Sequence, residues 1–178
     1  NKAGAPFFAK LASRDGKRLF LSGEGYSPEG NRPFLDAYEL ATGKATRLWR
    51  ADGASTYERI VRVLDPERGV LLTRVEGSRQ FPNYFVRNAK ARIAPRPVTS
   101  FENPYKSLEA VTTRKVRYRR ADGVDLAGDL HLPPGYDPQR DGRLPLLLEA
   151  YPAEYKDRAA AGMVDSSPHA FVRPSWGS

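Results

Sequence analysis

The stretch that decides the fold of the second half of the chain is VRYRRADGVDLAGDLHLPPGYD, residues 116–137. Val116 and Tyr118 alternate with arginines before Asp122-Gly123, and apolar residues alternate with polar ones from Leu126 to Leu132 after it. Alternation with period two is typical of a strand with one buried face, and Asp-Gly is a strong hairpin signal. Pro133-Pro134 ends the second strand because proline cannot donate to the ladder. These residues predict a β-hairpin that buries its apolar face.

The residues beyond the hairpin predict one more strand. Leu144–Tyr151 is a short continuous apolar run that breaks at Pro152, a pattern typical of a strand covered on both faces. After it, a short helix is expected only near Lys156–Ala161.

The first hundred residues predict short strands separated by turns. Strands are expected at 17–22, 34–40, 45–49, 68–75 and 83–88. The segment from Arg68 resembles the one from Lys17, and the segment from Asn83 resembles the one from Asp36, an offset of 47 residues (83 − 36). This offset is typical of β-propeller blades, so two blades are expected here and the remaining blades upstream. A chance echo in an unrelated β-rich domain is the alternative.

Residues 96–105 contain two prolines and little periodicity, which indicates a linker.

Composition excludes several classes of protein. The chain has 178 residues, a net charge of +8, 15 prolines, 15 glycines and no cysteine. The absence of cysteine rules out a disulfide framework and a thiolate zinc site, and the glycines and prolines favour turns and short strands. No apolar run approaches the roughly 18 residues that span a bilayer.

The one dense basic run, Arg114–Arg120, contains the period-two alternation of a solvated strand. The other basic residues are scattered among acids, and no nucleic-acid-binding motif accompanies them. Neither a nucleic acid nor a membrane is therefore expected as a partner.

The N-terminal residues lack both an initiator Met and a signal-peptide core, so the chain is expected to start inside a longer protein.

The motifs of nucleophilic hydrolysis are incomplete in this chain. Gly25–Glu29 comes closest to the Gly-x-Ser-x-Gly elbow but ends in Glu rather than Gly. His131 shares a strand face with Asp129, but a metal site needs more ligands, so a structural role is expected. His169 lies in a predicted loop and is expected to be exposed. No metal or organic cofactor is implied, and these residues alone contain no complete active site.

The second half nevertheless resembles a known family. The hairpin of residues 116–137, Leu144-Pro145-Leu146-Leu147 and Tyr151-Pro152-x-Glu154-Tyr155-Lys156 resemble the start of the catalytic domain of serine peptidases of the prolyl oligopeptidase family. Residues 151–156 and Ser167-Pro168-x-x-Phe171 are most similar to the glutamyl endopeptidase branch. The resemblance implies a mostly β chain: residues 1–103 as the last blades of a β-propeller, and residues 104–178 as the first strands of an α/β-hydrolase domain.

The resemblance also implies an activity and one site residue. The family hydrolyses short or unfolded peptides in a cavity between its two domains, in this branch after Glu. The position of Tyr151 matches a tyrosine whose hydroxyl donates to the oxyanion hole, where one donor contributes about 3–4 kcal/mol. A half-buried aromatic that caps the strand is the alternative. The catalytic Ser, Asp and His would lie downstream of this chain, so the chain alone should be inactive.

The expected partners are therefore a peptide substrate and the remainder of the same polypeptide. Two other functions stay open. One is a propeller scaffold with an inactive hydrolase-like tail, since folds host many functions. The other is an esterase or acyl-peptide hydrolase on the same scaffold.

Overall fold

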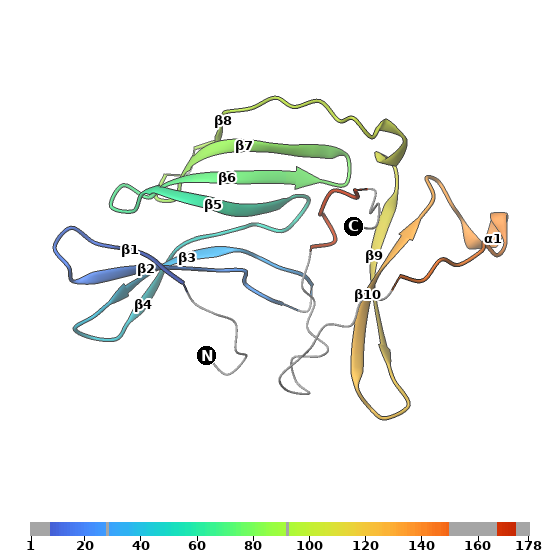
Figure 1. Cartoon of the computed structure of the whole chain (residues 1–178), viewed down its shortest axis with the longest axis horizontal. Coiled ribbons are helices and arrows are strands. Elements are labelled where there is room, and N and C mark those ends of the chain that lie inside the picture. Colours follow the sequence, from blue (N-terminus) through green and yellow to red (C-terminus); the bar gives the residue numbers. More distant parts are fainter. Residues whose placement is uncertain (1–7, 28, 92, 150–166, 174–178) are drawn as a thin grey trace.

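The computed structural model describes residues 8–27, 29–91, 93–149 and 167–173. These residues are mostly β, in three antiparallel sheets (Figure 1). Helix in this part of the chain is limited to the 3₁₀ turn η1, Lys106–Leu108, and the single turn α1, Pro138–Asp141. No helix among the described residues is long and apolar enough to span a membrane.

The first sheet has four strands in sequence order, each antiparallel to the next. They are β1 (Phe8–Ala12), β2 (Arg18–Gly23), β3 (Phe34–Glu39) and β4 (Ala45–Arg50). The last three confirm the strands that the sequence predicts. Gly16 and Gly43 have φ angles of +68° and +70° in the turns before β2 and β4, where glycine adopts a left-handed backbone without strain.

The second sheet repeats this arrangement. Its strands, also in sequence order, are β5 (Tyr57–Asp65), β6 (Val70–Gly77), β7 (Gln80–Asn88) and β8 (Arg96–Pro97). The similar segments from Lys17 and Arg68 form the second strand of each sheet, and those from Asp36 and Asn83 lie in the third. The internal repeat in the sequence is therefore a structural repeat as well.

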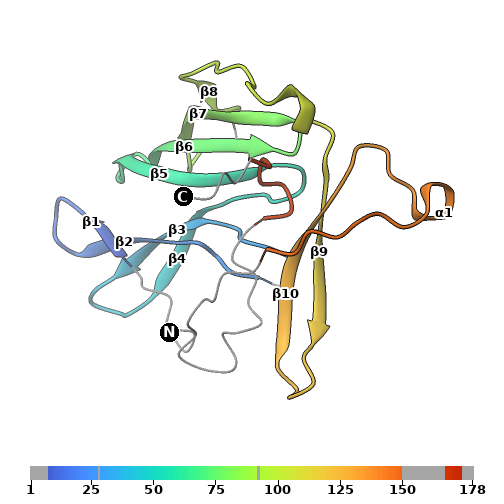
Figure 2. The same ribbon diagram turned by 45° about the vertical axis from the view of Figure 1, so that its right-hand side comes forward.

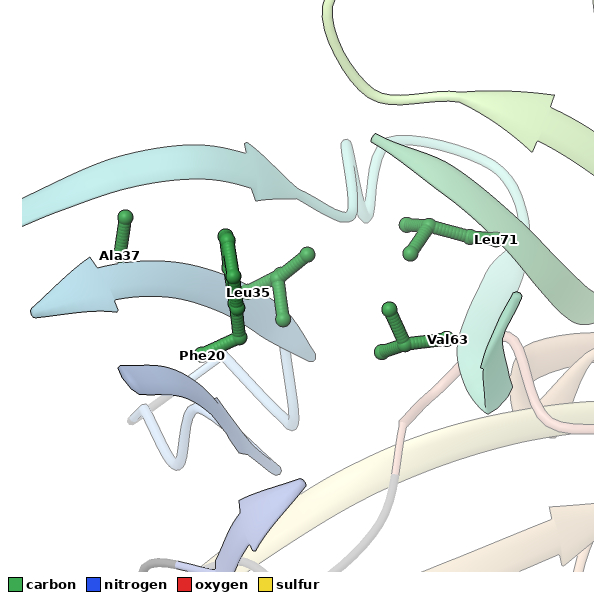
Figure 3. Packing of buried hydrophobic residues seen from close by; sticks show 5 residues of the cluster. All are labelled: Phe20, Leu35, Ala37, Val63 and Leu71. Atoms are coloured by element: carbon green, nitrogen blue, oxygen red, sulfur yellow. The ribbon is translucent and has the colours of Figure 1, made fainter. Parts of the chain in front are cut away.

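The main apolar core lies between the two sheets. Phe20, Leu35 and Ala37 of the first sheet meet Val63 and Leu71 of the second, and all five are buried (Figure 3). Burying one such large side chain stabilises a fold by about 1.5–3 kcal/mol. The sheets therefore stabilise each other through their facing sides.

A buried charge pair reinforces this contact. The Arg87 guanidinium donates to both carboxylate oxygens of Glu58 at 2.8 Å, so β7 is tied to β5. The same guanidinium lies 5.8 Å from the ring centroid of Trp49 in the first sheet. Arg87 thus joins two strands of the second sheet through the ion pair and contacts the first sheet through the cation–π contact.

The predicted linker begins as part of the second sheet. Arg96–Pro97 pairs with β7, and Asn83 then anchors the next residues. The Asn83 side-chain oxygen accepts hydrogen bonds from the Thr99 hydroxyl at 2.8 Å and from the Phe101 amide at 2.6 Å. Its amide group donates to the Phe101 carbonyl at 3.1 Å. The chain is therefore fastened to the second sheet up to Phe101.

The predicted hairpin is present as β9 (Thr112–Arg119) and β10 (Asp125–Leu132), and it stands apart from both four-stranded sheets (Figure 2). Gly123, with φ +81°, makes the turn. Lys115 pairs with Asp129 at 2.6 Å and Arg119 with Asp125 at 2.8 Å, all on one face. The basic run is thus a strand whose cations meet acids across the hairpin, as the alternation indicates.

The apolar face of the hairpin differs from the prediction. Leu126, Leu130 and Leu132 are half-buried, but Tyr118 is 57% exposed and Val116 is also exposed. The physical reason is that no third strand pairs with the hairpin among the described residues, and a two-stranded ribbon alone cannot bury a face.

The strand expected at Leu144–Tyr151 is not formed in its described part, residues 144–149. Residues 142–149 have no regular secondary structure, and Leu147 is 94% exposed. A strand exists only with a partner to accept its hydrogen bonds, and here none of the described strands pairs with it. The described residues accordingly contain no α/β-hydrolase layer. The short helix expected near Lys156–Ala161 lies outside the described residues.

Candidate functional site

Tyr151, the one catalytic residue that the sequence predicts, lies outside the described residues. Its role in an oxyanion hole therefore stays a prediction. The structure does place the other polar residues that the sequence singles out, and it brings together a charged group that the sequence does not reveal.

Both histidines have local partners. His131 lies on the charged face of the hairpin, where its Nδ1 is 3.0 Å from the Thr113 hydroxyl, while the neighbouring Asp129 pairs with Lys115. This arrangement supports a structural role. His169 is half-buried rather than exposed, because its turn packs onto the second sheet, and its backbone amide donates to the Ser167 hydroxyl at 3.2 Å.

No group of three or more His, Cys, Asp or Glu residues that could hold a metal ion occurs within the described ranges.

The loop that comes closest to a nucleophile elbow is a closed turn. The Ser27 hydroxyl donates to the Gly30 carbonyl at 2.6 Å, and the Arg32 amide donates to the Gly25 carbonyl at 2.9 Å. Gly25 has φ +64°, and a Cβ at this position would lie 2.0 Å from the Arg32 carbonyl oxygen. Gly25 is thus needed to close this loop, and Ser27 is engaged in the same turn.

Charged residues gather where β6 ends and β5 begins. Arg59 and Arg74 are directly opposite each other on β5 and β6, and Tyr57 is opposite Glu76 on the same face. The Arg74 guanidinium lies 3.0 Å from the Glu76 carboxylate, with both side chains more than nine-tenths buried. Arg173 approaches the same carboxylate oxygen at 3.7 Å. We refer to Arg59, Arg74 and Arg173 as the arginine cluster.

Tyr57 borders the arginine cluster. Its hydroxyl donates to the Glu24 carboxylate at 3.3 Å, and Glu24 directly follows β2 of the first sheet. Burial, together with the negative charge of Glu24, raises the pKa of Tyr57 to about 12. The phenol therefore keeps its proton at neutral pH and acts as a hydrogen-bond donor.

Residues 167–173 carry Arg173 to this position. Phe171 is buried with its ring 5.3 Å from that of Phe81 in an edge-to-face contact at 82°, and Ser167 at the start of the segment is also buried. The segment lies near the ends of β5 and β6 in both views (Figures 1 and 2). The contact between Phe171 and Phe81 thus brings Arg173 next to Glu76. Periodicity and motifs in the sequence give no signal for this proximity.

Comparison with known proteins gives two plant relatives. The chain is 36% identical over 177 residues to a probable chloroplastic glutamyl endopeptidase of Oryza sativa subsp. japonica. It is 37% identical over 180 residues to a probable chloroplastic glutamyl endopeptidase of Arabidopsis thaliana. These alignments cover 94% and 96% of this chain and 19% of each plant protein.

Other comparisons add less. No protein-family model matches the chain. Among solved structures, a variant of the AtxE2 isopeptidase with Astexin3-dC4 bound is similar over 75% of this chain and 19% of that protein, with a TM-score of 0.47 and 18% identity. The unliganded AtxE2 isopeptidase is similar over 71% of this chain and 18% of that protein, with a TM-score of 0.44 and 17% identity.

The sequence identity extends over nearly the whole chain, so the chain is homologous to part of the plant glutamyl endopeptidases. This finding confirms the resemblance that the sequence motifs carry. The chain spans about a fifth of the length of these relatives.

Proposed function

From its homology to plant glutamyl endopeptidases, we infer that this chain is a segment of a serine peptidase of the prolyl oligopeptidase family. The observation that carries the proposal is an identity of 36–37% over nearly all of the chain. In this proposal the longer protein hydrolyses bonds in short or unfolded peptides, after Glu, as the name of the two relatives suggests.

The architecture proposed for the segment follows the sheets. Residues 1–103 form the last blades of a β-propeller, which is supported by two four-stranded sheets of the same strand order packed face to face. Residues 104–178 begin an α/β-hydrolase domain. Support comes from a hairpin with an exposed apolar face and from the exposed leucines of 144–148, which further strands of a larger sheet would cover.

The chemistry proposed is acyl transfer to a serine. A serine outside this chain attacks the scissile carbonyl carbon while a histidine takes its proton, and the amine product leaves with that proton. Water then hydrolyses the acyl-enzyme. The Tyr151 hydroxyl donates to the carbonyl oxygen as it becomes negative, which lowers the barrier by about 3–4 kcal/mol for one such donor. Gly-x-Ser-x-Gly does not occur within these 178 residues, so the chain alone should be inactive.

The test uses the full-length protein. We expect it to cleave Glu-containing peptides and to react with a fluorophosphonate, which labels activated serines. Tyr151→Phe should lower kcat by about 10²–10³-fold. Tyr118→Phe, an exposed phenol on the hairpin, is the matched control and should leave kcat unchanged.

Three outcomes separate the alternatives. Absence of both hydrolysis and labelling would contradict the enzyme and favour a scaffold protein. Labelling with cleavage of acylated peptides or esters, and not of Glu-containing peptides, would favour the esterase or acyl-peptide hydrolase. Unchanged turnover in Tyr151→Phe would remove the oxyanion role while leaving the peptidase in place.

A further inference from the structure

The arginine cluster contains more positive charge than its acids neutralise. Arg59, Arg74 and Arg173 contribute three positive charges, and Glu76 is the only carboxylate within 4 Å of any of them among the described residues. Glu24, which hydrogen-bonds to Tyr57 on the border of the cluster, supplies a second negative charge. The group therefore keeps one positive charge in excess even when both acids are counted.

The arrangement of Arg59 and Arg74 is unfavourable for folding alone. The two residues are directly opposite on neighbouring strands, so their side chains share a face of the sheet. Like charges in this position repel and destabilise the sheet. Arg74 is also almost completely buried. Among the described residues its guanidinium makes one hydrogen bond, to Glu76, although it has five N–H groups to donate. An anion beside these arginines would accept hydrogen bonds from the remaining N–H groups and offset the repulsion between Arg59 and Arg74.

We propose that the arginine cluster binds the acidic side chain of the peptide substrate, which makes Arg59 and Arg173 specificity-determining residues. This inference rests on the proposed function, since it needs a peptide substrate. Guanidinium groups suit a carboxylate because they donate parallel, charge-assisted hydrogen bonds. The protonated Tyr57 phenol adds a neutral donor at the border of the site. Glu76 holds Arg74 and Arg173 together and offsets only part of the positive charge of the cluster.

The chain supplies variants that separate specificity from stability. Arg173 is 53% exposed and Arg59 is exposed, so Arg173→Gln and Arg59→Gln should fold. Arg68→Gln is the matched control, because Arg68 lies in the turn at the opposite end of the same strand pair and is 83% exposed. The assay compares kcat/KM of the full-length protein for two peptides that differ only in Glu or Gln at the cleaved position.

The expected result is a fall of about 10- to 100-fold in the Glu-to-Gln preference for each cluster variant, the range of one charge-assisted hydrogen bond. The Arg68→Gln control should keep the Glu-to-Gln preference and the turnover of the wild-type protein. Added salt should weaken the preference of the wild-type protein, since part of the site is exposed to solvent.

Two results would overturn the inference. If wild type prefers Glu and both cluster variants keep that preference, the acid binds elsewhere, and the proposed peptidase function stands. If wild type cleaves neither peptide, the proposed function fails, and the inference about its substrate fails with it. The two failures are distinguished by the activity of the wild-type protein.

Discussion

Removing one member of the Glu58–Arg87 pair should weaken the second sheet more than removing both. The Arg87 guanidinium donates two hydrogen bonds of 2.8 Å to the Glu58 carboxylate, with 10% of the Glu58 side chain and 22% of the Arg87 side chain exposed. Glu58→Leu leaves the Arg87 guanidinium over Trp49 with no carboxylate. Arg87→Leu leaves a carboxylate in the contact between the sheets.

The magnitude follows from the burial of the pair. Breaking a buried ion pair by removing one partner costs about 3–5 kcal/mol, because the remaining charge is desolvated and unpaired. Since Arg87 keeps contact with solvent, we expect about 3 kcal/mol for each single variant. Replacing both residues with leucine removes both desolvated charges, and the cost of the double variant should be smaller than that of either single change.

Urea unfolding of the four proteins, followed by circular dichroism, measures these free energies as a double-mutant cycle. Arg119→Gln is the control, because Arg119 and Asp125 pair on the hairpin with both side chains about two-thirds exposed. We expect no measurable change for this variant. Single variants of Glu58 and Arg87 that unfold like the control, or a double variant whose cost is the sum of the two, would refute the argument.

Three further predictions test other contacts. Leu71→Ala should lower the free energy of unfolding by about 2–5 kcal/mol because Leu71 is fully buried between the sheets. Leu64→Ala, at a residue 49% exposed, should lower it far less. Equal effects of the two variants in urea unfolding would mean that the sheets do not share a core. Asn83→Ala should release the segment after β8, seen as faster hydrogen exchange of the Phe101 amide; unchanged exchange would contradict the anchoring role. Folding raises the pKa of Tyr57 from 10.0 to about 12, so the folded state holds the phenol proton more tightly, and the contribution of Tyr57 to the free energy of unfolding is fully present below pH 10 and is lost as pH rises to about 12. Tyr57→Phe should remove this part of the pH dependence of stability. An alkaline unfolding profile identical to that of the wild type would contradict it.

Local sequence patterns predicted most of the strands. Alternation and Asp-Gly turns are properties of neighbouring residues, so β2, β3 and the β9–β10 hairpin could be read from a few positions each. The offset of 47 residues also indicated the structural repeat. The strand β5 was not predicted, because two bulges, at Ile60/Arg62 and Val63/Asp65, interrupt its period-two pattern. The turn α1 was also missed, although Asp137-Pro138 carries the signal of a helix N-terminus, and the Asp137 carboxylate does cap it.

The amino-acid order alone is enough to establish the turns, the family motifs and the strand repeat. The first two depend on residues close together in the chain, and the repeat is the recurrence of such a short pattern at a fixed offset. Burial and charge pairing depend on partners distant in the chain. Leu144–Tyr151 has the composition of a buried strand, yet without a strand beside it the described part of this run stays exposed. Arg173 and Glu76 are nearly a hundred residues apart, and the packing of Phe171 on Phe81 brings them together. Three-dimensional packing therefore determines which arginines gather into a cluster, because side-chain proximity across the sheets has no signature in local sequence.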